Sequence, residues 1–307
     1  MTRRRERFET PDGDFLDLDW FTVAEAPGRS GLGAPAPLVL ILHGLEGSTL
    51  STYMHVLARE LAARGIECAG LNFRSCGGEM NRKPRMYHAG EWGDAVFVLE
   101  RLAARFPGRA LCVAGFSLGG NALLRWLGEA GGQASALVRA AAVVSVPYDL
   151  AAGSRFIASG VRRVYLRRLL STLKAKIVAK RELLPDLSMR IDVARALAAK
   201  DFFEFDDAVV APLHGFRGVD DYYARASSGP WLHGIRVPTL LVHAEDDPFL
   251  PASSIPRAAI AANAQLTAAI SRHGGHVGFV HGTPWAPRFF AEERVAEFFA
   301  AALRSPT

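Results

Sequence analysis

The sequence predicts an α/β fold: a mostly parallel, doubly wound sheet with an N-terminal antiparallel hairpin and an inserted helical cap. The first observation is that short, continuously apolar runs alternate with helix-like patterns along most of the chain. Such alternation is typical of a parallel sheet covered by helices on both faces. The second is that the alternation stops once, between residues 148 and 236. With 307 residues, half of them hydrophobic, the chain can bury a large core.

The hairpin is predicted from a turn sequence between two strand-like stretches. "PDGD" separates "ERFET" from "FLDLDWF", and Asp-Gly in this setting favours a hairpin. Residues 24–37, rich in Gly, Pro and Ala, predict a loop. The predicted parallel strands are 38–43, 66–73, 110–116, 141–146, 239–244 and 266–271, and the predicted helices are 50–64, 91–106, 119–129, 254–262 and 288–304. Right-handed crossovers between the strands make the sheet doubly wound.

The segment without the strand–helix rhythm predicts a cap inserted between two strands of the sheet. Residues 148–236 form this predicted cap, and residues 1–147 and 237–307 form the predicted core. Within the cap, two helix-like patterns and then a loop-like stretch follow one another at 162–183, 189–200 and 203–229.

Charge and cysteine content restrict the function classes. The net charge is +5, with no lysine tract and no predicted strand on which aromatic residues are spaced among basic ones, so we expect no nucleic-acid partner. Cys68, Cys76 and Cys112 are odd in number and lack CxxC spacing, which favours a reducing compartment. No apolar signal region follows the basic N-terminus, and no run reaches the roughly 18–20 apolar residues of a membrane span. We therefore expect a soluble, cytoplasmic protein; its oligomeric state is open.

A candidate nucleophile lies in "AGFSLGGN", which follows a predicted strand and precedes a predicted helix. Gly115, Ser117 and Gly119 match G-x-S-x-G, the pattern that holds a serine at a strained strand-to-helix turn. A side chain two residues to either side would collide with the neighbouring strand or helix, and glycine removes that collision. A serine hydroxyl alone is a weak nucleophile, so Ser117 needs partners.

The candidate general base is a histidine in the loop after the last predicted strand. "SRHGGHVGFV" offers His273 and His276. We favour His276, because the two glycines before it let the loop bring its imidazole over the turn. The histidines that we expect either to be structural or to support the catalytic residues from behind are His43, His88, His214, His243 and His281.

The candidate acid lies in "LLVHAEDDPFLP". Asp247 precedes Pro251 by four residues, as in the recurring acid loop, and such a carboxylate fixes the tautomer of the histidine. Asp246 is the second choice and is better placed to brace the loop. The chain order Ser117, Asp247, His276 is the order of the α/β hydrolases and differs from the orders of the two best-known protease folds.

Two backbone N–H groups are candidates for binding the oxyanion that develops on a carbonyl oxygen. Leu118 directly follows the nucleophile, and Leu45 lies in "LHGLEGS", where Gly44 lets the backbone bend. A simple turn after a strand is the alternative explanation of this loop. No metal-type cluster, phosphate-binding loop or dinucleotide motif occurs, so we expect no metal and no cofactor.

Longer phrases carry a resemblance to a known family. "HGLEGSTLSTYMHVLARELAARGIECAGLNFRSCGGEMNRKPRMYHAGE", "GFSLGGNALLRWLGE", "VPTLLVHAEDDPFLP" and "GGHVGFV" resemble the YheT-like branch of the α/β hydrolases, bacterial relatives of eukaryotic membrane-associated lipases and esterases. The resemblance implies cofactor-free hydrolysis of carboxylic esters, lipid esters included. It places the nucleophile, acid and base on Ser117, Asp247 and His276. Where the family usually has "NFRGCSGE", this chain has "NFRSCGGE" (72–79), in a loop expected to border the pocket.

The predicted cap also contains a basic segment. Residues 155–181 carry nine Arg or Lys and no Asp or Glu. One interpretation is an amphipathic helix that contacts an anionic membrane. The other is a solvated helix face whose opposite side packs on the sheet.

The expected function is cleavage of short- to medium-chain acyl esters or lipid esters through an acyl-enzyme. A small-molecule or lipid ester is the expected partner. A thioesterase or amidase with the same three residues, and a non-catalytic ligand-binding protein on this fold, are alternatives that the sequence leaves open.

Overall fold

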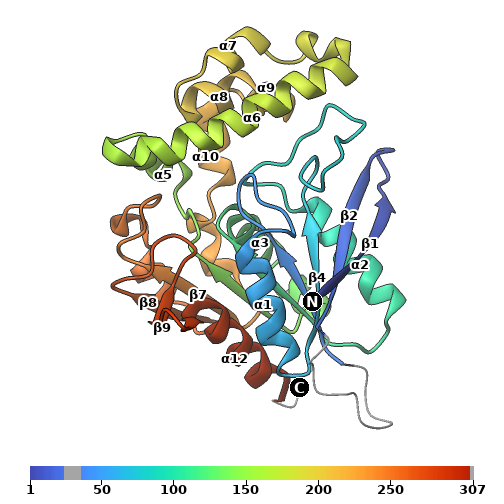
Figure 1. The fold of residues 1–307 in the computed structure, drawn as a ribbon, viewed down its shortest axis with the longest axis vertical. Helices are drawn as coiled ribbons and strands as arrows, with labels where there is room; N and C mark the ends of the chain where they lie inside the picture. Colours follow the sequence, from blue (N-terminus) through green and yellow to red (C-terminus); the bar gives the residue numbers. More distant parts are fainter. Residues whose placement is uncertain (24–35, 305–307) are drawn as a thin grey trace.

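A computed structural model describes residues 1–23 and 36–304, so most of the loop predicted at 24–37 lies outside the described residues. The main sheet has eight strands, in the order β1-β2-β4-β3-β5-β6-β7-β8, and Figure 1 shows β1 and β2 side by side at one end of it. β1 and β2 form an antiparallel hairpin, β2 is antiparallel to β4, and the remaining neighbours in this sheet are parallel. The predicted hairpin and parallel strands are therefore confirmed. Their bounds are β1 (Thr2–Glu9), β2 (Phe15–Thr22), β3 (Leu38–Leu42), β4 (Glu67–Asn72), β5 (Leu111–Phe116), β6 (Ala140–Val144), β7 (Thr239–Ala244) and β8 (Leu266–Ser271).

Apolar side chains alternate between the two faces of the sheet, because successive residues of a strand point in opposite directions. In β6, for example, Ala141 and Val143 join the core on one face, whereas Ala142 and Val144 join the core on the other. Helices cover both faces, and Figure 1 shows α1 beside α12 on one of them. The helices that cover the two faces of the sheet are α1 (Thr52–Ala62), α2 (Gly93–Arg105), α3 (Leu118–Ala130), α4 (Gly132–Leu137), α11 (Arg257–Ala261) and α12 (Phe290–Arg304).

Helices also fill the segment between β6 and β7, and Figure 1 shows them as a separate layer at the top of the view, above the sheet. The prediction of a loop at 203–229 is wrong, because the helices α8, α9 and α10 occupy most of this segment. Each has no more than eight residues, too few for a clear helical period. The division of the chain into core and cap stays a prediction. These elements are α5 (Leu150–Ile157), η1 (Gly160–Arg162), α6 (Arg163–Leu183), η2 (Pro185–Met189), α7 (Val193–Ala198), α8 (Phe202–Ala208), α9 (Val210–Leu213), α10 (Val219–Ala226) and η3 (Gly229–Gly234).

One interpretation expected the long helix α6 to pack on the sheet, and this is wrong: α6 packs inside the helical layer. Its buried Leu166 and Leu170 belong to an apolar cluster made mostly of residues from α6, α7 and α8. Its outer side exposes Arg163, Val164 and Arg167 to solvent. Contact of this basic side with an anionic membrane stays a prediction. None of the described helices is long and apolar enough to cross a membrane.

The C-terminal region contains an element that the sequence patterns missed. β9 (Val280–Thr283) and β10 (Ala286–Phe289) form a separate antiparallel hairpin. Both strands are largely exposed, so they lack the apolar alternation that predicts a strand. The helix predicted from 254 begins only at Arg257, directly after a proline.

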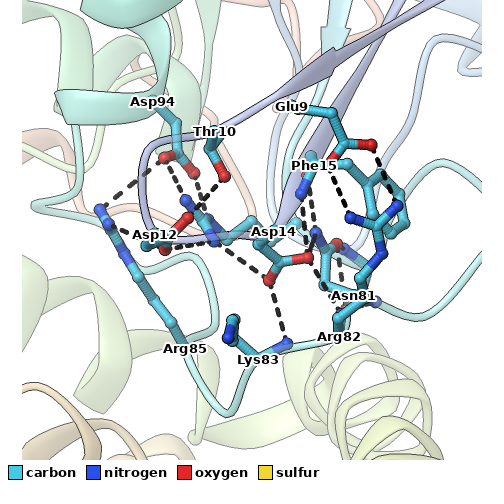
Figure 2. A network of polar contacts seen from close by, with 12 residues as sticks. Glu9, Thr10, Asp12, Asp14, Phe15, Asn81, Arg82, Lys83, Arg85 and Asp94 are labelled. Atoms are coloured by element: carbon cyan, nitrogen blue, oxygen red, sulfur yellow. Dashed lines mark hydrogen bonds and ion pairs between the residues drawn. The ribbon is translucent and has the colours of Figure 1, made fainter.

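A buried ionic network joins the turn between β1 and β2 to the loop after β4. The guanidinium of Arg74 contacts the carboxylates of Asp94 at 2.7 Å, Asp12 at 2.9 Å and Asp14 at 3.1 Å. Asp14 also accepts a hydrogen bond from the side-chain amide of Asn81 at 2.8 Å, and Figure 2 shows these two residues side by side. Buried charges are costly unless they are paired. The network therefore holds the turn and the loop in one arrangement.

α6 inserts Lys180 next to this network. The residue is fully buried, and its Nζ lies 3.5 Å from the backbone oxygens of Asn81 and Arg85. Burial lowers the pKa of Lys180 to about 8, even though the Asp14 carboxylate raises it. Between pH 8 and the ordinary value of 10.5, the unfolded chain therefore holds more protons at this residue than the folded chain. The contribution of Lys180 therefore makes the free energy of unfolding rise with pH between pH 8 and 10.5.

We predict that Lys180→Met raises the free energy of unfolding near pH 7 by about 1 kcal/mol or more, since a tenfold change in proton affinity corresponds to about 1.4 kcal/mol. Methionine fills a similar volume without a charge. The advantage over the wild type should shrink from pH 8 to pH 10.5, as folded wild-type Lys180 loses its proton. Urea unfolding of both proteins across this range measures the difference. A difference that does not change with pH, or a variant less stable at pH 7, contradicts this prediction.

Candidate active site

Ser117 lies at the turn from β5 into α3. Its φ of +50° is a conformation that side-chain-bearing residues rarely adopt. The turn leaves no space for side chains on either side: a Cβ at Gly115 would lie 2.7 Å from Gly120, and a Cβ at Gly119 would lie 2.5 Å from the His43 carbonyl oxygen. The steric need for glycine at both positions, predicted from the sequence, is therefore confirmed.

His276 reaches Ser117 from the loop after β8. Its Nε2 lies 2.9 Å from Ser117 Oγ. The imidazole stacks on the ring of Phe249, with centroids 4.3 Å apart and planes inclined by 22°. This stacking and the near-complete burial of the side chain restrict the ring to one orientation.

Asp247, and not Asp246, contacts His276. Asp247 Oδ2 lies 2.7 Å from His276 Nδ1, and the carboxylate is fully buried. Its Oδ1 accepts backbone N–H groups from Phe249 at 2.7 Å and Leu250 at 3.2 Å. With Nδ1–H donating to this carboxylate, Nε2 is the nitrogen left to accept a proton from the serine.

Asp246 braces the loop that carries His276. Its Oδ1 accepts the N–H groups of Gly274 and Gly275, both at 2.9 Å, and its Oδ2 lies 3.2 Å from His273 Nδ1. The Gly275 N–H is the main cause of the lowered pKa of Asp246. The structure thus places Asp246 in the bracing position expected for it, and places His273 away from the serine.

The two backbone groups expected to bind an oxyanion lie beside Ser117. A Cβ at Gly44 would lie 3.2 Å from Ser117 Cβ, so the loop after β3 approaches the serine closely. Leu45 and Leu118 both line the cavity at Ser117. Among the described residues, neither Leu45 N–H nor Leu118 N–H has a hydrogen-bond acceptor. Leu118 opens α3, where N–H groups have no partner within the helix.

Glu46, directly after Leu45, connects this loop to α6. Its φ is +55°, and its N–H donates to Tyr87 Oη at 2.9 Å. Tyr87 Oη donates in return to Glu46 Oε1 at 2.7 Å, and Lys176 Nζ donates to the same oxygen at 2.7 Å. Lys176 Nζ also lies 3.1 Å from Cys76 Sγ. A lysine of the helical layer therefore helps to hold the backbone beside Leu45.

A cavity of about 540 Å³ opens at Ser117 and His276. This volume lies within the roughly 300–1,000 Å³ typical of small-molecule sites. Its wall is mostly apolar, and half of the residues that line it lie in the segment between β6 and β7. Such wall residues include Leu150, Ile157, Leu169, Leu173, Phe205 and Val209.

The loop 72–79 does not line this cavity, so the expectation that it borders the pocket is wrong; residues 86–89 line the wall instead. Ser75 has a φ of +61°, where the family's usual glycine is unstrained, and its Oγ accepts the Asn81 N–H at 3.1 Å. At Gly77 a Cβ would lie 3.0 Å from an Asp17 carboxylate oxygen. The exchange of serine and glycine therefore acts on the polar corner around Asn81 and not on the cavity.

Two of the histidines expected either to be structural or to support the catalytic residues from behind, His88 and His214, line the cavity itself, and sequence reasoning missed this position. The rings of His88 and His214 lie 4.4 Å apart. Burial lowers the pKa of both, to about 4 for His214. His43 is structural: it is buried, and its Nε2 accepts the Phe73 N–H at 3.1 Å. The part of the chain that the structure describes contains no group of three or more His, Cys, Asp or Glu suited to a metal.

Comparisons with known proteins identify relatives of this chain. The sequence profile of the Hydrolase_4 family, described as serine aminopeptidase, S33, matches residues 33–279. The chain is 38% identical to YheT, named an esterase, of Escherichia coli (strain K12), over 98% of this chain and 85% of that protein. It is 29% identical to phospholipase ABHD3 of Mus musculus, over 98% of this chain and 72% of that protein. It is also 29% identical to monoacylglycerol lipase of Saccharomyces cerevisiae, over 90% and 59%.

Solved structures share the fold. The esterase Pf2001 of Pyrococcus furiosus has a TM-score of 0.60 at 16% identity, over 98% of this chain and 91% of that chain. Est1E from Butyrivibrio proteoclasticus has a TM-score of 0.58 at 14% identity, over 98% and 99%. Fold, profile match and full-length similarity agree: the chain belongs to the Hydrolase_4 family and, among the esterase- and lipase-type α/β hydrolases, to the YheT-like branch.

Proposed function

We propose that this protein is a serine hydrolase that cleaves carboxylic esters through an acyl-enzyme intermediate. The observation that carries the proposal is the hydrogen-bonded series from Asp247 through His276 to Ser117, with distances of 2.7 and 2.9 Å. Ser117 and His276, the last two members of the series, line an apolar cavity. A serine, a histidine and a buried acid in this order are the groups that activate a serine hydroxyl for acyl transfer.

In the first step, Ser117 Oγ attacks the ester carbonyl carbon while His276 Nε2 takes the hydroxyl proton. A carbon–oxygen bond forms, and the carbonyl oxygen becomes an oxyanion that the Leu45 and Leu118 N–H groups bind. The Asp247 carboxylate stabilises the imidazolium that has formed. The ester bond then breaks, and His276 gives its proton to the leaving alcohol.

In the second step, water replaces the alcohol. His276 takes a proton from the water, whose oxygen attacks the acyl carbon of the ester to Ser117. The Leu45 and Leu118 N–H groups also bind the oxyanion that forms in this step. Its collapse releases the carboxylic acid, and the proton on His276 returns to Ser117. No group other than these side chains and backbone N–H groups is required.

The cavity wall supports an ester with an apolar chain as the substrate. Its lining is mostly hydrophobic, which suits short- to medium-chain acyl groups or lipid esters. The names of the relatives, esterase, phospholipase and monoacylglycerol lipase, support the same class. The family description as serine aminopeptidase favours an amidase as the second candidate. Matched ester, thioester and anilide substrates with one acyl group distinguish these activities.

We predict that Ser117→Ala or His276→Ala lowers kcat/KM for p-nitrophenyl alkanoates by about 10⁴-fold or more, and that Asp247→Asn lowers it by about 10⁴-fold. Asp246→Asn is the matched control, because an amide oxygen can still accept the two loop N–H groups. It should stay close to the wild type. Equal losses in Asp246→Asn and Asp247→Asn, in folded proteins, contradict the assignment of the acid.

We predict that Lys176→Met lowers kcat about tenfold with little change in KM, because Lys176 acts on the backbone beside Leu45 and does not line the cavity. Removing one donor to the oxyanion lowers kcat by about 10²–10³-fold, so a residue that only positions the donor should have a smaller effect on kcat. Lys174→Met is the control, since Lys174 Nζ contacts only the Ala199 carbonyl among the described residues. Lys176→Arg should recover part of the rate. Equal kinetics for the two methionine variants contradict this positioning role.

A further inference from the structure

One carboxylate lies in the wall of the apolar cavity without a role in the proposed reaction. Asp206, on α8, lines the same cavity as Ser117 and His276. Its surroundings are aromatic and aliphatic, with Phe202 and Phe205 from its own helix in the same wall. A carboxylate in such a wall is costly unless something compensates it.

The protein supplies only part of that compensation. Asp206 Oδ2 accepts a hydrogen bond from Tyr223 Oη at 2.8 Å. Tyr223 Oη in turn accepts one from Ser154 Oγ at 3.1 Å. Ser154 lies on α5 and Tyr223 on α10, and both residues are buried and line the cavity. Three separate helices therefore converge on one polar spot in the wall.

Among the residues that the structure describes, none supplies a cation that balances this spot. Within the described part of the chain, no Lys, Arg or His nitrogen lies within 4.0 Å of the Asp206 carboxylate, whereas its neighbour Asp207 pairs with Arg195 at 2.8 Å. Burial raises the pKa of Asp206 to about 7. Asp207 also accepts the Val219 N–H at 2.9 Å, outside this cavity. Asp207 thus has a structural role in the fold, whereas Asp206 pairs only with Tyr223 within residues 1–23 and 36–304.

We propose that Asp206 and Tyr223 form a polar subsite that hydrogen-bonds a hydroxyl group on the substrate, so that the enzyme prefers esters with a hydroxylated acyl or alcohol chain. This inference rests on the proposed ester hydrolysis. A hydroxyl group is the chemistry that fits, because it can donate to a carboxylate and accept from a carboxylic acid. An ammonium group would have to leave water for an apolar wall, and an anionic group would be repelled by the carboxylate.

Pairs of esters with chains of equal length test the preference. One member carries a terminal methyl group and the other a terminal hydroxyl group, first in the acyl chain of p-nitrophenyl esters and then in the alcohol chain of alkanoates. The two series show which side of the ester carries the recognised hydroxyl. In at least one series we expect kcat/KM to favour the hydroxylated member about tenfold at a particular chain length, after correction for intrinsic reactivity.

Asp206→Leu should bring this ratio close to one, chiefly by improving hydrolysis of the methyl-ended ester. Asp207→Asn is the matched control and should keep the wild-type ratio. Asp207→Asn should also keep the wild-type rate of labelling by a small fluorophosphonate, which reports Ser117 alone; labelling of Asp206→Leu shows whether its Ser117 is still reactive. A wild-type ratio near one at every chain length overturns the subsite even if Asp206→Leu fails to fold.

The remaining outcomes separate this inference from the proposed function. If the wild type hydrolyses the methyl-ended esters but shows no hydroxyl preference, only the subsite is wrong. If it hydrolyses neither ester and is not labelled, the proposed function is wrong. An ammonium-ended ester that outperforms the hydroxyl-ended one also overturns the proposal, because it shows a cation site.

Discussion

The backbone of Ser117 turns from β5 into α3 at a φ of +50°, and glycines on three segments make room for it. Such a conformation costs about 1–3 kcal/mol, which the packed core around the turn must offset. The turn fixes the hydroxyl at the carboxyl end of the central strands, where parallel strands bring their following loops together. Without that fixed position, neither His276 nor the Leu45 loop would meet the serine.

Electrostatic contacts link this site to the helical layer above it. Lys176 and Lys180 are four residues apart on α6, so they share one face of the helix. Lys176 contacts Glu46 beside the expected oxyanion loop, and Lys180 enters the corner next to the Arg74 network. Figure 2 shows how densely the carboxylates and basic groups of that corner are connected. One face of one helix therefore connects the loop at the site with the ionic corner of the fold.

The sequence predicts the sheet and the three converging residues well, because the signals are local. Gly115 and Gly119 predict the turn at the serine. The four-residue spacing between Asp247 and Pro251 identifies Asp247, and not Asp246, as the acid. Contacts between distant parts of the chain leave no such signal: Glu46 and Lys176 are 130 residues apart. Asp206 and Asp207 are adjacent and chemically identical, so only the helix orientation shows which one faces the cavity. The helices α8, α9 and α10 were not predicted, because each is too short to repeat the helical pattern of apolar residues.

The most direct test of covalent catalysis is intact-mass measurement after reaction with a fluorophosphonate, on the wild type and on Ser117→Ala. An activated serine gives a single adduct on the wild type, located at Ser117 by peptide mapping, and none on the variant. No adduct on a folded wild-type protein, or an adduct that persists in Ser117→Ala, contradicts the assignment of Ser117 as the nucleophile. In the first case, ligand binding without catalysis would become the better explanation of this fold.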